Sequence, residues 1–363
     1  PQVVTEAKAS GAQVIDGSLK FDQVFETRLK RNFSSSGNSK TWTWSCWTKR
    51  GNLGSGILID CSSGSDRFRI RYISDKFDMA SDTTIYRQTN ALLRDPSAWY
   101  HLVAVLDTTL DNANANDRVR LYINGVRVTS FNTSNNPSQN NSFILNTNIL
   151  HQIGELCDGG SNYDGEMSQV YFIDGAALEP ENFGFTDPLT NTWRPKKYKH
   201  RTDLYGVTWS SALVGDASGF QSAALAADGF DGEVGSSNNQ YAQNNTGSNP
   251  STITFTPVGG IKFNSSIQVY LINADNTVNV NGEGAQTIAA NQWVTVKTGS
   301  GTLNTLVFSR ASNGGASFSA IRVDGHILID AQNDNSFYLP MDGNSLIGND
   351  KSNPNPLNGG TTW

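Results

Sequence analysis

The sequence has few charged side chains, no excess of basic residues and no long apolar run. Only 17% of its 363 residues are Asp, Glu, Lys or Arg, whereas soluble globular domains typically carry roughly 25%. Asn, Ser, Thr and Gly fill the polar positions instead, and this composition favours β structure over a helical protein covered with charge pairs. The formal charge of −6 leaves no basic excess to neutralise phosphates, so nucleic acid is not an expected partner.

Membrane insertion is not expected either. The sequence has no apolar run near the roughly 18 residues that a membrane helix needs, and its first ten residues lack the apolar core of a signal peptide. Cys46, Cys61 and Cys157 are too few and too widely spaced for a disulfide framework, and they have no spacing typical of a metal site. We expect buried free thiols in a protein that is assembled in a reducing cytoplasm.

Short segments in which apolar and polar residues alternate dominate the chain, as in 68–72, 118–123 and 266–272. This period of two is typical of strands with one buried face. Between them recur Asn-Gly and Asp-Gly pairs, which supply the positive φ values of a type I′ hairpin turn. Four of these pairs are Asn124-Gly125, Asp174-Gly175, Asn281-Gly282 and Asp324-Gly325. Since no helical period or blade-length repeat is sustained, we predict an all-β protein built from antiparallel sandwiches.

The composition changes near residue 206. Of the 27 Lys and Arg residues, those that follow Gly206 are only Lys262, Lys297, Arg310, Arg322 and Lys351. A second run of strands is predicted beyond this point, at 252–256, 293–297, 303–308 and 321–329. We predict five parts: an N-terminal arm at 1–13, a first sandwich at 14–192, a basic connector at 193–206, a second, smaller β-sandwich at 207–335 and a C-terminal segment at 336–363.

Five segments in order resemble laminin G-like and pentraxin-like concanavalin A jelly rolls. They are SLKF at 18–21, TWTWSCWTKR at 41–50, WYHLVAVLD at 99–107, RVRLYINGVR at 118–127, and QIG at 152–154 followed by YDGEMSQVYFIDGAAL at 163–178. The resemblance covers roughly residues 14–185. It implies that the first domain is a concanavalin A-like antiparallel jelly-roll sandwich.

A narrower resemblance connects three further segments to virion structural and fibre proteins of tailed phages, notably marine ones. They are YFIDGAALEPENFG at 171–184, WRPKKY at 193–198 and FYLPMDGN at 337–344. The last two lie close together in those proteins, so residues 207–335 are expected to be an insertion. The insert resembles a carbohydrate-binding-module-like sandwich in its strand pattern and in the phrase SAIRVDGHILID at 319–330.

Glucanases also share the concanavalin A-like fold, so the carboxylates of this chain are candidate catalytic residues. A glycoside hydrolase needs two carboxyl groups that face one cleft, and the retaining glucanases of this fold carry them on one strand as Glu-x-Asp-x-x-Glu. No such run occurs: Glu155 and Asp158 have the wrong spacing, and Glu166 stands alone. We therefore predict that the protein is not an enzyme.

The remaining chemistry-bearing motifs are also missing. The four histidines have no Gly-x-Ser-x-Gly context for a nucleophilic triad and are expected to be structural: His101, His151, His200 and His326. No glycine-rich phosphate loop occurs, and we predict no cofactor. Many relatives of the jelly roll hold Ca²⁺ at loop carboxylates. Two loops are acidic here: one contains Asp107, Asp111 and Asp117, and the other contains Asp158 and Asp164. Because neither set aligns with the family's ligand positions, no metal site is predicted.

Two surfaces are candidates for binding. A glycan site would combine an exposed aromatic ring with amide side chains, and Tyr241, in the sequence NNQYAQNN, is the best candidate in the second domain. In the first domain Trp42 and Trp44 share one strand face and Trp47 takes the other, which leaves open which set is exposed. The connector is the second surface, and its candidate partner-docking residues are Arg194, Lys196, Lys197, Lys199 and Arg201.

The leading functional prediction is a non-enzymatic phage virion protein, as a tail fibre, adhesin or capsid-decorating subunit. It would be assembled in the host cytoplasm, contact other virion subunits as a homo-oligomer, and bind host-surface glycans. The alternative is a carbohydrate-binding module of a bacterial polysaccharide-degrading protein. A glucanase that uses Glu155 and Glu166 is the third hypothesis.

Overall fold

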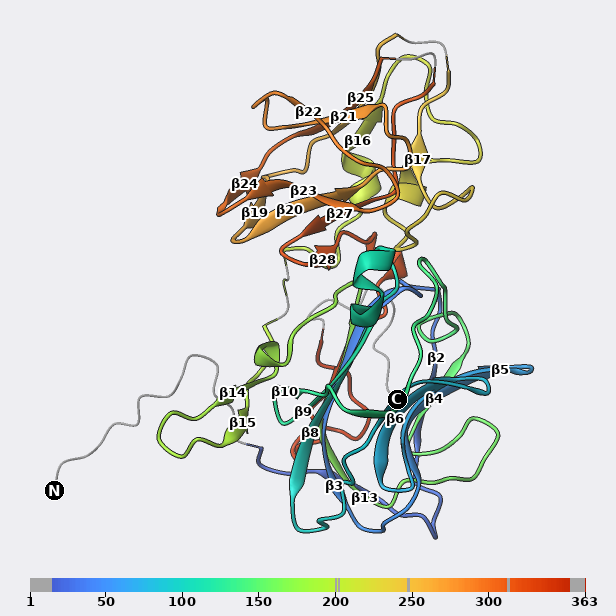
Figure 1. Cartoon of the computed structure of the whole chain (residues 1–363), viewed down its shortest axis with the longest axis vertical. Helices are drawn as coiled ribbons and strands as arrows, with labels where there is room; N and C mark the ends of the chain where they lie inside the picture. Colours follow the sequence, from blue (N-terminus) through green and yellow to red (C-terminus); the bar gives the residue numbers. More distant parts are fainter. Residues whose placement is uncertain (1–14, 200, 202, 247–248, 312–313, 353–362) are drawn as a thin grey trace, which may run out of the picture.

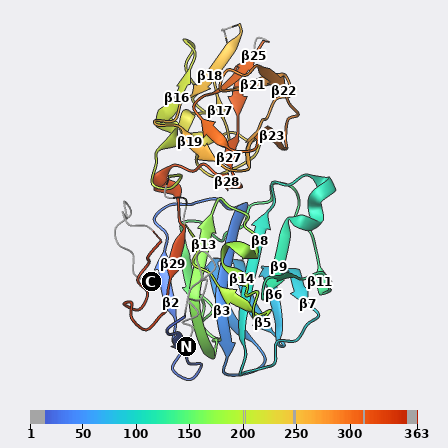
Figure 2. The same ribbon diagram turned by 90° about the vertical axis from the view of Figure 1, so that its left-hand side faces the viewer.

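The structure is a computed structural model, and it describes residues 15–199, 201, 203–246, 249–311, 314–352 and 363. Two β-sandwiches are stacked end to end along the longest axis of the molecule (Figures 1 and 2). Every strand pairing in the described part of the chain is antiparallel. The prediction of an all-β protein with a concanavalin A-like first domain is confirmed.

The first sandwich has two seven-stranded sheets. In spatial order the first sheet is β1 (Leu19–Phe21), β13 (Gly165–Asp174), β3 (Thr41–Arg50), β8 (Trp99–Asp107), β9 (Val119–Ile123) and β10 (Val126–Arg127), with β29 (Phe337–Leu339) also paired to β13. The second sheet is β11 (Phe131–Ser134), β7 (Thr84–Thr89), β6 (Lys76–Ser81), β5 (Asp66–Ile73), β4 (Gly56–Ser63), β12 (Leu150–Ile153) and β2 (Leu29–Asn32). The short 3₁₀ turn η1 (Asn112–Asp117) joins β8 to β9.

Alternation along the strands places one set of side chains between the two sheets. On β5, Phe68, Ile70 and Tyr72 are buried while the intervening arginines are partly exposed. The indole of Trp42 packs edge-on against Phe68, with ring centroids 5.5 Å apart. Burial of each large apolar side chain stabilises the fold by roughly 1.5–3 kcal/mol. The core of the first domain therefore follows directly from the period of two in the sequence.

The outer face of the first sheet is covered by the segment that follows β13. This segment contains the 3₁₀ turn η2 (Pro180–Asn182) and the hairpin of β14 (Gly184–Thr186) and β15 (Trp193–Pro195). Phe183 and Tyr198 pack on Tyr171 of β13, with ring centroids 5.4 and 6.2 Å away. The sheet is therefore apolar on both faces.

The second sandwich also has two main sheets. One is β16 (Leu213–Gly215), β18 (Ser251–Phe255), β25 (Leu306–Arg310), β21 (Asn276–Val280) and β22 (Ala285–Thr287); the other is β23 (Trp293–Thr298), β20 (Ser266–Tyr270), β27 (Ala320–Val323) and β28 (His326–Ile327). Two smaller sheets have two strands each: β17 (Ala242–Gln243) pairs with β26 (Ser317–Phe318), and β19 (Ile261–Phe263) pairs with β24 (Gly301–Leu303). The 3₁₀ turns of this part of the chain are η3 (Trp209–Ala212), η4 (Ala226–Gly229) and η5 (Ala331–Asn333).

The path of the chain links the two sandwiches twice. Tyr198 packs in the outer cluster of the first domain, and Leu204 already belongs to the core of the second. The chain returns at β29, whose residues 337–339 pair with β13 of the first domain. Trp363 then packs on Phe337, with ring centroids 4.6 Å apart. The second sandwich thus lies between two segments that both contribute to the first.

Polar contacts join the sandwiches where they meet. The ammonium of Lys40 is buried, lies 3.0 Å from Glu233 Oε2 and donates to the Val234 carbonyl at 2.6 Å. On another part of the boundary, the Trp293 Nε1–H donates to Thr109 Oγ1 at 2.6 Å. Because a buried cation without a partner is costly, these contacts favour one relative orientation of the two domains.

The turns follow the sequence prediction with one exception. Both residues have positive φ in the Asn-Gly or Asp-Gly turns at 124–125, 281–282 and 324–325. At 174–175 only Gly175 does, since Asp174 is the last residue of β13, so the type I′ prediction was wrong there. Segment 303–308 forms parts of two strands, because the Asn281 carboxamide accepts from the N–H groups of residues 304 and 305 and breaks the run.

Other sequence expectations concern cysteines and membranes. Cys46 and Cys61 are buried free thiols, whereas Cys157 is half-exposed, so the expectation of burial holds for two of the three. None of the helices in the described residues has the length and apolar character to cross a membrane. The predicted arm at 1–13 lies outside the described residues.

Candidate functional site

The aromatic strand β3 carries tryptophans on both of its faces. Trp42 and Trp44 point into the core of the first sandwich and are fully buried. Trp47 points to the outer face of the same sheet, where it lines a cavity. All three indoles of β3 are therefore shielded from solvent, and of the three only Trp47 lines this cavity.

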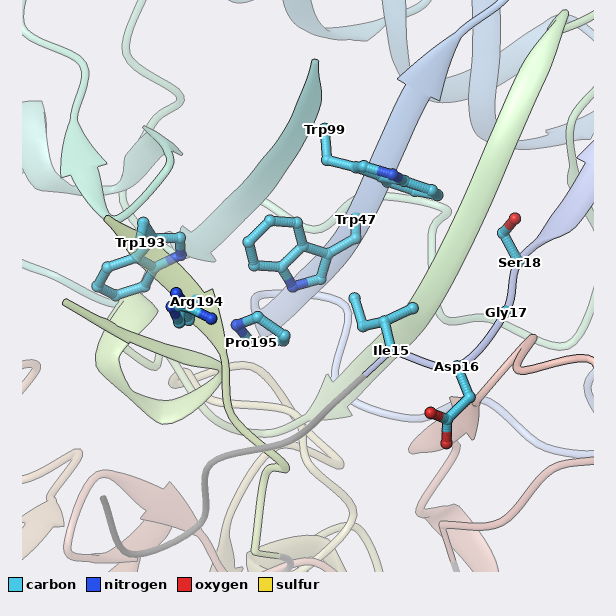
Figure 3. Close-up of a pocket in the computed structure, with 9 residues that line it drawn as sticks. All are labelled: Ile15, Asp16, Gly17, Ser18, Trp47, Trp99, Trp193, Arg194 and Pro195. Carbon is cyan, nitrogen blue, oxygen red and sulfur yellow. The ribbon is translucent and has the colours of Figure 1, made fainter. Parts of the chain in front are cut away.

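Three tryptophans from separate strands line this cavity, which we call the tryptophan pocket (Figure 3). Trp47 comes from β3, Trp99 from the first position of β8 and Trp193 from β15. The cavity encloses about 410 Å³, and its other lining residues are Ile15, Asp16, Gly17, Ser18, Arg194 and Pro195. Its volume falls in the range of small-molecule sites, roughly 300–1,000 Å³.

His101, the cross-strand partner of Trp47, holds two of these indoles in place. The Trp193 Nε1–H donates to His101 Nδ1 at 2.9 Å, and His101 Nε2 lies 2.9 Å from Ser45 Oγ. Because Nδ1 accepts, the network assigns the ring proton to Nε2, which donates to Ser45. Trp47 stacks on the imidazole with ring centroids 4.9 Å apart. The hydrogen bond and the stack together fix the orientation of both indoles.

Burial also sets the charge of this histidine. It lowers the pKa of His101 to about 3, because the charged imidazolium loses its hydration in an apolar site. The ring is therefore neutral in the physiological range. Trp193 therefore keeps its acceptor near neutral pH.

Two glycines make room for the Trp193 ring. A Cβ on Gly125, in the turn between β9 and β10, would lie 2.5 Å from that ring. A Cβ on Gly184 of β14 would lie 2.4 Å from it on the other side of the indole. Both distances are far below van der Waals contact, so only glycine allows the ring to lie here. The wall of the pocket is thus built by residues from three distant parts of the sequence.

The charged groups of the pocket lie at its mouth. Arg194 Nε lies 2.7 Å from Asp187 Oδ2, which neutralises the guanidinium. Asp16 forms no ion pair with any described cation, and its carboxylate points away from the indoles (Figure 3). The pocket therefore combines indole rings with polar groups, which Asp16, Ser18 and Arg194 contribute.

The structure disperses the five predicted docking residues: Arg194, Lys196, Lys197, Lys199 and Arg201. Lys196 Nζ donates to the Glu181 carbonyl at 2.8 Å, and Arg201 Nη1 lies 2.9 Å from Asp324 Oδ2 of the second sandwich. Arg194 is bound at the pocket mouth, whereas Lys197 and Lys199 are exposed. Lys196 and Arg201 thus stabilise the connector itself, whereas Arg194, Lys197 and Lys199 remain exposed.

Tyr241, the predicted glycan contact, lies just before β17 in the second sandwich, and its side chain is half-buried. It therefore lies in a different sandwich from the tryptophan pocket, which is formed by the first sandwich; Figure 1 labels β17 in one sandwich and β3, β8 and β15 in the other. The structure does not bring the two together, so Tyr241 remains a separate prediction.

The acidic residues that were weighed as catalysts have individual partners. Glu155 Oε2 lies 2.9 Å from Arg28 Nη1, and Glu166 Oε2 accepts from Ser18 Oγ at 2.9 Å. Asp158 is paired with Arg67. Each of these carboxylates therefore has a structural partner.

The loop carboxylates that were weighed for calcium are also engaged. Asp111 caps η1 through the Asn114 N–H, Asp117 is paired with Arg127, and Asp164 accepts from Asn52. Asp107 binds an arginine of the second sandwich. Among the residues that the structure describes, no group of three or more His, Cys, Asp or Glu side chains is placed to hold a metal ion.

Sequence reasoning missed the pocket because its walls are far apart in the chain. Trp99 was interpreted as the start of a core strand and Trp193 as part of the basic connector. No local pattern links positions 47, 99 and 193. The signal that was available is weak: Trp193 and Arg194 belong to a segment, 193–198, that resembles phage virion proteins.

Residues 27–182 match a laminin G family model that is described as the concanavalin A-like lectin/glucanases superfamily. The match spans the first sandwich from the end of the loop after β1 to η2. It therefore includes β3 and β8 with Trp47 and Trp99, but not Trp193. Among curated proteins, none matches the sequence.

Several solved structures are similar to part of the chain. A heptameric pentraxin from Limulus polyphemus is 15% identical over 44% of this chain and 77% of its own, with a TM-score of 0.32. Domain 4 of an extracellular arabinanase from Geobacillus stearothermophilus is 18% identical over 40% and 65%, with a TM-score of 0.31. Tailspike protein 2 of an Escherichia coli O157:H7 bacteriophage is 15% identical over 46% and 23%, with a TM-score of 0.32.

Proposed function

We propose that this protein is a non-enzymatic virion protein of a tailed phage, and that it binds a host-surface glycan in the tryptophan pocket. The observation that carries the glycan proposal is the group of three indoles around one cavity of about 410 Å³. The flat, apolar face of an indole covers the C–H face of a sugar ring, while polar groups at a rim bind the hydroxyls. A lectin-like sandwich supports such a role, although a fold alone does not determine function.

The absence of catalysis is part of the proposal. A hydrolase needs two carboxyl groups that share a cleft, whereas Glu155 and Glu166 bind Arg28 and Ser18 respectively. In the tryptophan pocket the sole acidic side chain of the described lining is Asp16. This arrangement supports binding without bond cleavage.

The virion assignment rests on sequence. The segments at 171–184, 193–198 and 337–344 resemble virion structural and fibre proteins, and the fold gives them one shared place, since Tyr171 stacks on Tyr338 with ring centroids 4.2 Å apart. We expect the protein to contact other virion subunits and to form a homo-oligomer. Exposed apolar side chains lie at a cleft of about 660 Å³ that is lined by β1, β2, the loop between them and Ile347, where Phe25 and Ile347 are 78% and 66% exposed.

Binding is tested with a glycan array, followed by titration of the glycans that are retained. Trp99→Ala should abolish retention, because the indole lies at a strand end and its loss leaves the core intact. Phe25→Ala is the matched control, because Phe25 is an exposed aromatic of the same sandwich that lies beside a different cleft. Equal retention by Trp99→Ala and the unchanged protein would reject the pocket as the glycan site.

The virion role is tested separately by mass spectrometry of purified particles from the source. Detection of this chain in stoichiometric amounts is expected. If glycans bind but particles lack the chain, the alternative function, a carbohydrate-binding module of a bacterial polysaccharide-degrading protein, takes its place.

A further inference from the structure

We propose that the tryptophan pocket selects an uncharged pyranose residue, and that His101 is the positioning residue that holds Trp193 as one wall of the pocket. This inference rests on the proposed glycan-binding function and narrows it to a ligand class. It follows from the charges at the pocket mouth and from the hydrogen bonds behind the indoles.

The charges at the mouth disfavour an acidic sugar. The positive charge of Arg194 is neutralised by Asp187 at 2.7 Å, and Asp16 adds a carboxylate that no described cation neutralises. The three groups together carry a net negative charge. A sialic or uronic acid would therefore bring its carboxylate toward like charge, and it would lose hydration in an aromatic cavity without gaining an unpaired cation.

A neutral sugar finds suitable partners at the same rim. Asp187 contacts the Nε of Arg194, so the two terminal NH₂ groups of the guanidinium can donate to ring hydroxyls. The C–H face of the ring would lie against Trp47 and Trp99, which face the cavity (Figure 3). Stacking and hydroxyl recognition need no charge on the ligand.

His101 makes the wall rigid before the ligand arrives. Its Nδ1 accepts from the Trp193 Nε1–H at 2.9 Å, and its Nε2 is held by Ser45 Oγ at 2.9 Å. Trp193 is also confined by Gly125 and Gly184. A preformed wall lowers the ordering cost of binding. The titratable and charged groups nearest the pocket are Asp16, Arg194 and Asp187.

Selectivity is tested by isothermal titration of paired glycans that differ by one terminal residue, neutral in one member and sialic or uronic acid in the other. We expect the neutral member to bind at least about tenfold more tightly, which corresponds to about 1.4 kcal/mol, and Trp99→Ala to abolish its binding. Equal or tighter binding of the acidic member, lost in Trp99→Ala, would overturn the ligand class and leave the proposed function standing. Failure of every pair to bind would reject the proposed function itself.

The positioning role is tested with His101→Phe and His101→Gln. Phenylalanine keeps a ring against Trp47 but removes the acceptor of Trp193, so the affinity for the neutral glycan should fall at least about tenfold and the tryptophan emission should shift. Glutamine can supply a carbonyl acceptor and should restore part of the affinity. The unchanged protein should bind equally at pH 5.5 and 8. If His101→Phe folds with an unchanged circular dichroism spectrum and binds the neutral glycan as tightly as the unchanged protein, the positioning role is rejected. If His101→Phe fails to fold, the positioning role is rejected when His101→Gln binds as tightly as the unchanged protein at both pH 5.5 and pH 8.

Discussion

Arg322 of β27 and Asp107 of β8 form a buried ion pair across the boundary between the two sandwiches. Arg322 Nη2 lies 3.0 Å from Asp107 Oδ2, and the two side chains are 8% and 3% exposed. The guanidinium carbon also lies 4.0 Å from the ring centroid of Trp293, while Asp107 accepts from the hydroxyls of Thr41 and Thr109. Each charge has partners in both domains, so the pair fixes how the second sandwich is seated on the first.

Removal of this arginine should destabilise the whole chain. Arg322→Ala leaves the Asp107 carboxylate buried without its cation, and breaking a buried pair in this way costs about 3–5 kcal/mol. We expect the unchanged protein to unfold in one calorimetric transition and Arg322→Ala to unfold in two, because the domains lose a buried polar contact. Urea denaturation and differential scanning calorimetry measure both effects.

A surface ion pair of the same sandwich provides the control. Arg310 Nε lies 2.7 Å from Asp275 Oδ2, where the side chains are 19% and 45% exposed. Such exposed pairs contribute about 0–1 kcal/mol, so Arg310→Ala should change the free energy of unfolding little. Equal destabilisation by the two substitutions would contradict the role assigned to Arg322.

A carboxyl group near the domain boundary should make stability depend on pH. Burial, together with the charges of Glu233 and Asp228, raises the pKa of Asp231 to about 8, although the Glu233 N–H donates to it at 2.7 Å. The unfolded chain loses this proton near pH 4. Between about pH 4 and 8 the folded state therefore holds the extra proton, and the contribution of this group to the free energy of unfolding falls as pH rises, by at most about 1.4 kcal/mol per unit.

Asp231→Asn should remove this dependence, because asparagine resembles the neutral acid. Urea midpoints should agree with the unchanged protein near pH 4 and exceed it near pH 8. Asp216→Asn is the opposite case: burial opposes its ionisation, but hydrogen bonds from Ser218 and Ser251 outweigh it and hold the pKa of Asp216 below its usual range. That substitution should destabilise at pH 7 and have less effect at low pH. The same pH profile for both variants would contradict these assignments.

The loop carboxylates lead us to expect no response to calcium. Asp111 and Asp117 are engaged by Asn114 and Arg127, so a cation would have to displace existing partners before it gained new ones. Millimolar calcium or chelator should leave the melting temperature unchanged. A calcium-dependent rise of several degrees would reveal a site that these contacts do not account for.

The fold was predictable because its signals are local. The alternation at 68–72 reappears as β5, and the Asn124-Gly125 pair has two positive φ values. Each depends on residues that are adjacent in the chain, and the physical rule needs no knowledge of distant partners. The error at Asp174 has the opposite origin, because its conformation is determined by the continuation of β13 rather than by the glycine that follows.

The candidate site was not predictable for the same reason. Whether Trp47 or the pair of Trp42 and Trp44 lines a cavity depends on which face of the first sheet forms the core and on how the β14–β15 hairpin covers the other face. Trp193 becomes a wall only when His101 supplies an acceptor 92 positions away. Such contacts are tertiary, and no residue pattern in one sequence specifies them.

The glycines around Trp193 permit a test that separates pocket shape from fold stability. Gly125 and Gly282 are each the second residue of an Asn-Gly turn, with φ of 79° and 76°, so alanine at either position costs about 1–2 kcal/mol through backbone strain. A Cβ at Gly125 would lie 2.5 Å from the Trp193 ring, whereas one at Gly282 would meet nothing within 4 Å. Both variants should therefore lose stability in urea through the same backbone strain, but Gly125→Ala alone should also displace the indole, increase its quenching by acrylamide and weaken glycan binding at least about tenfold. Equal binding by the two variants would mean that Trp193 is not a wall of the binding site.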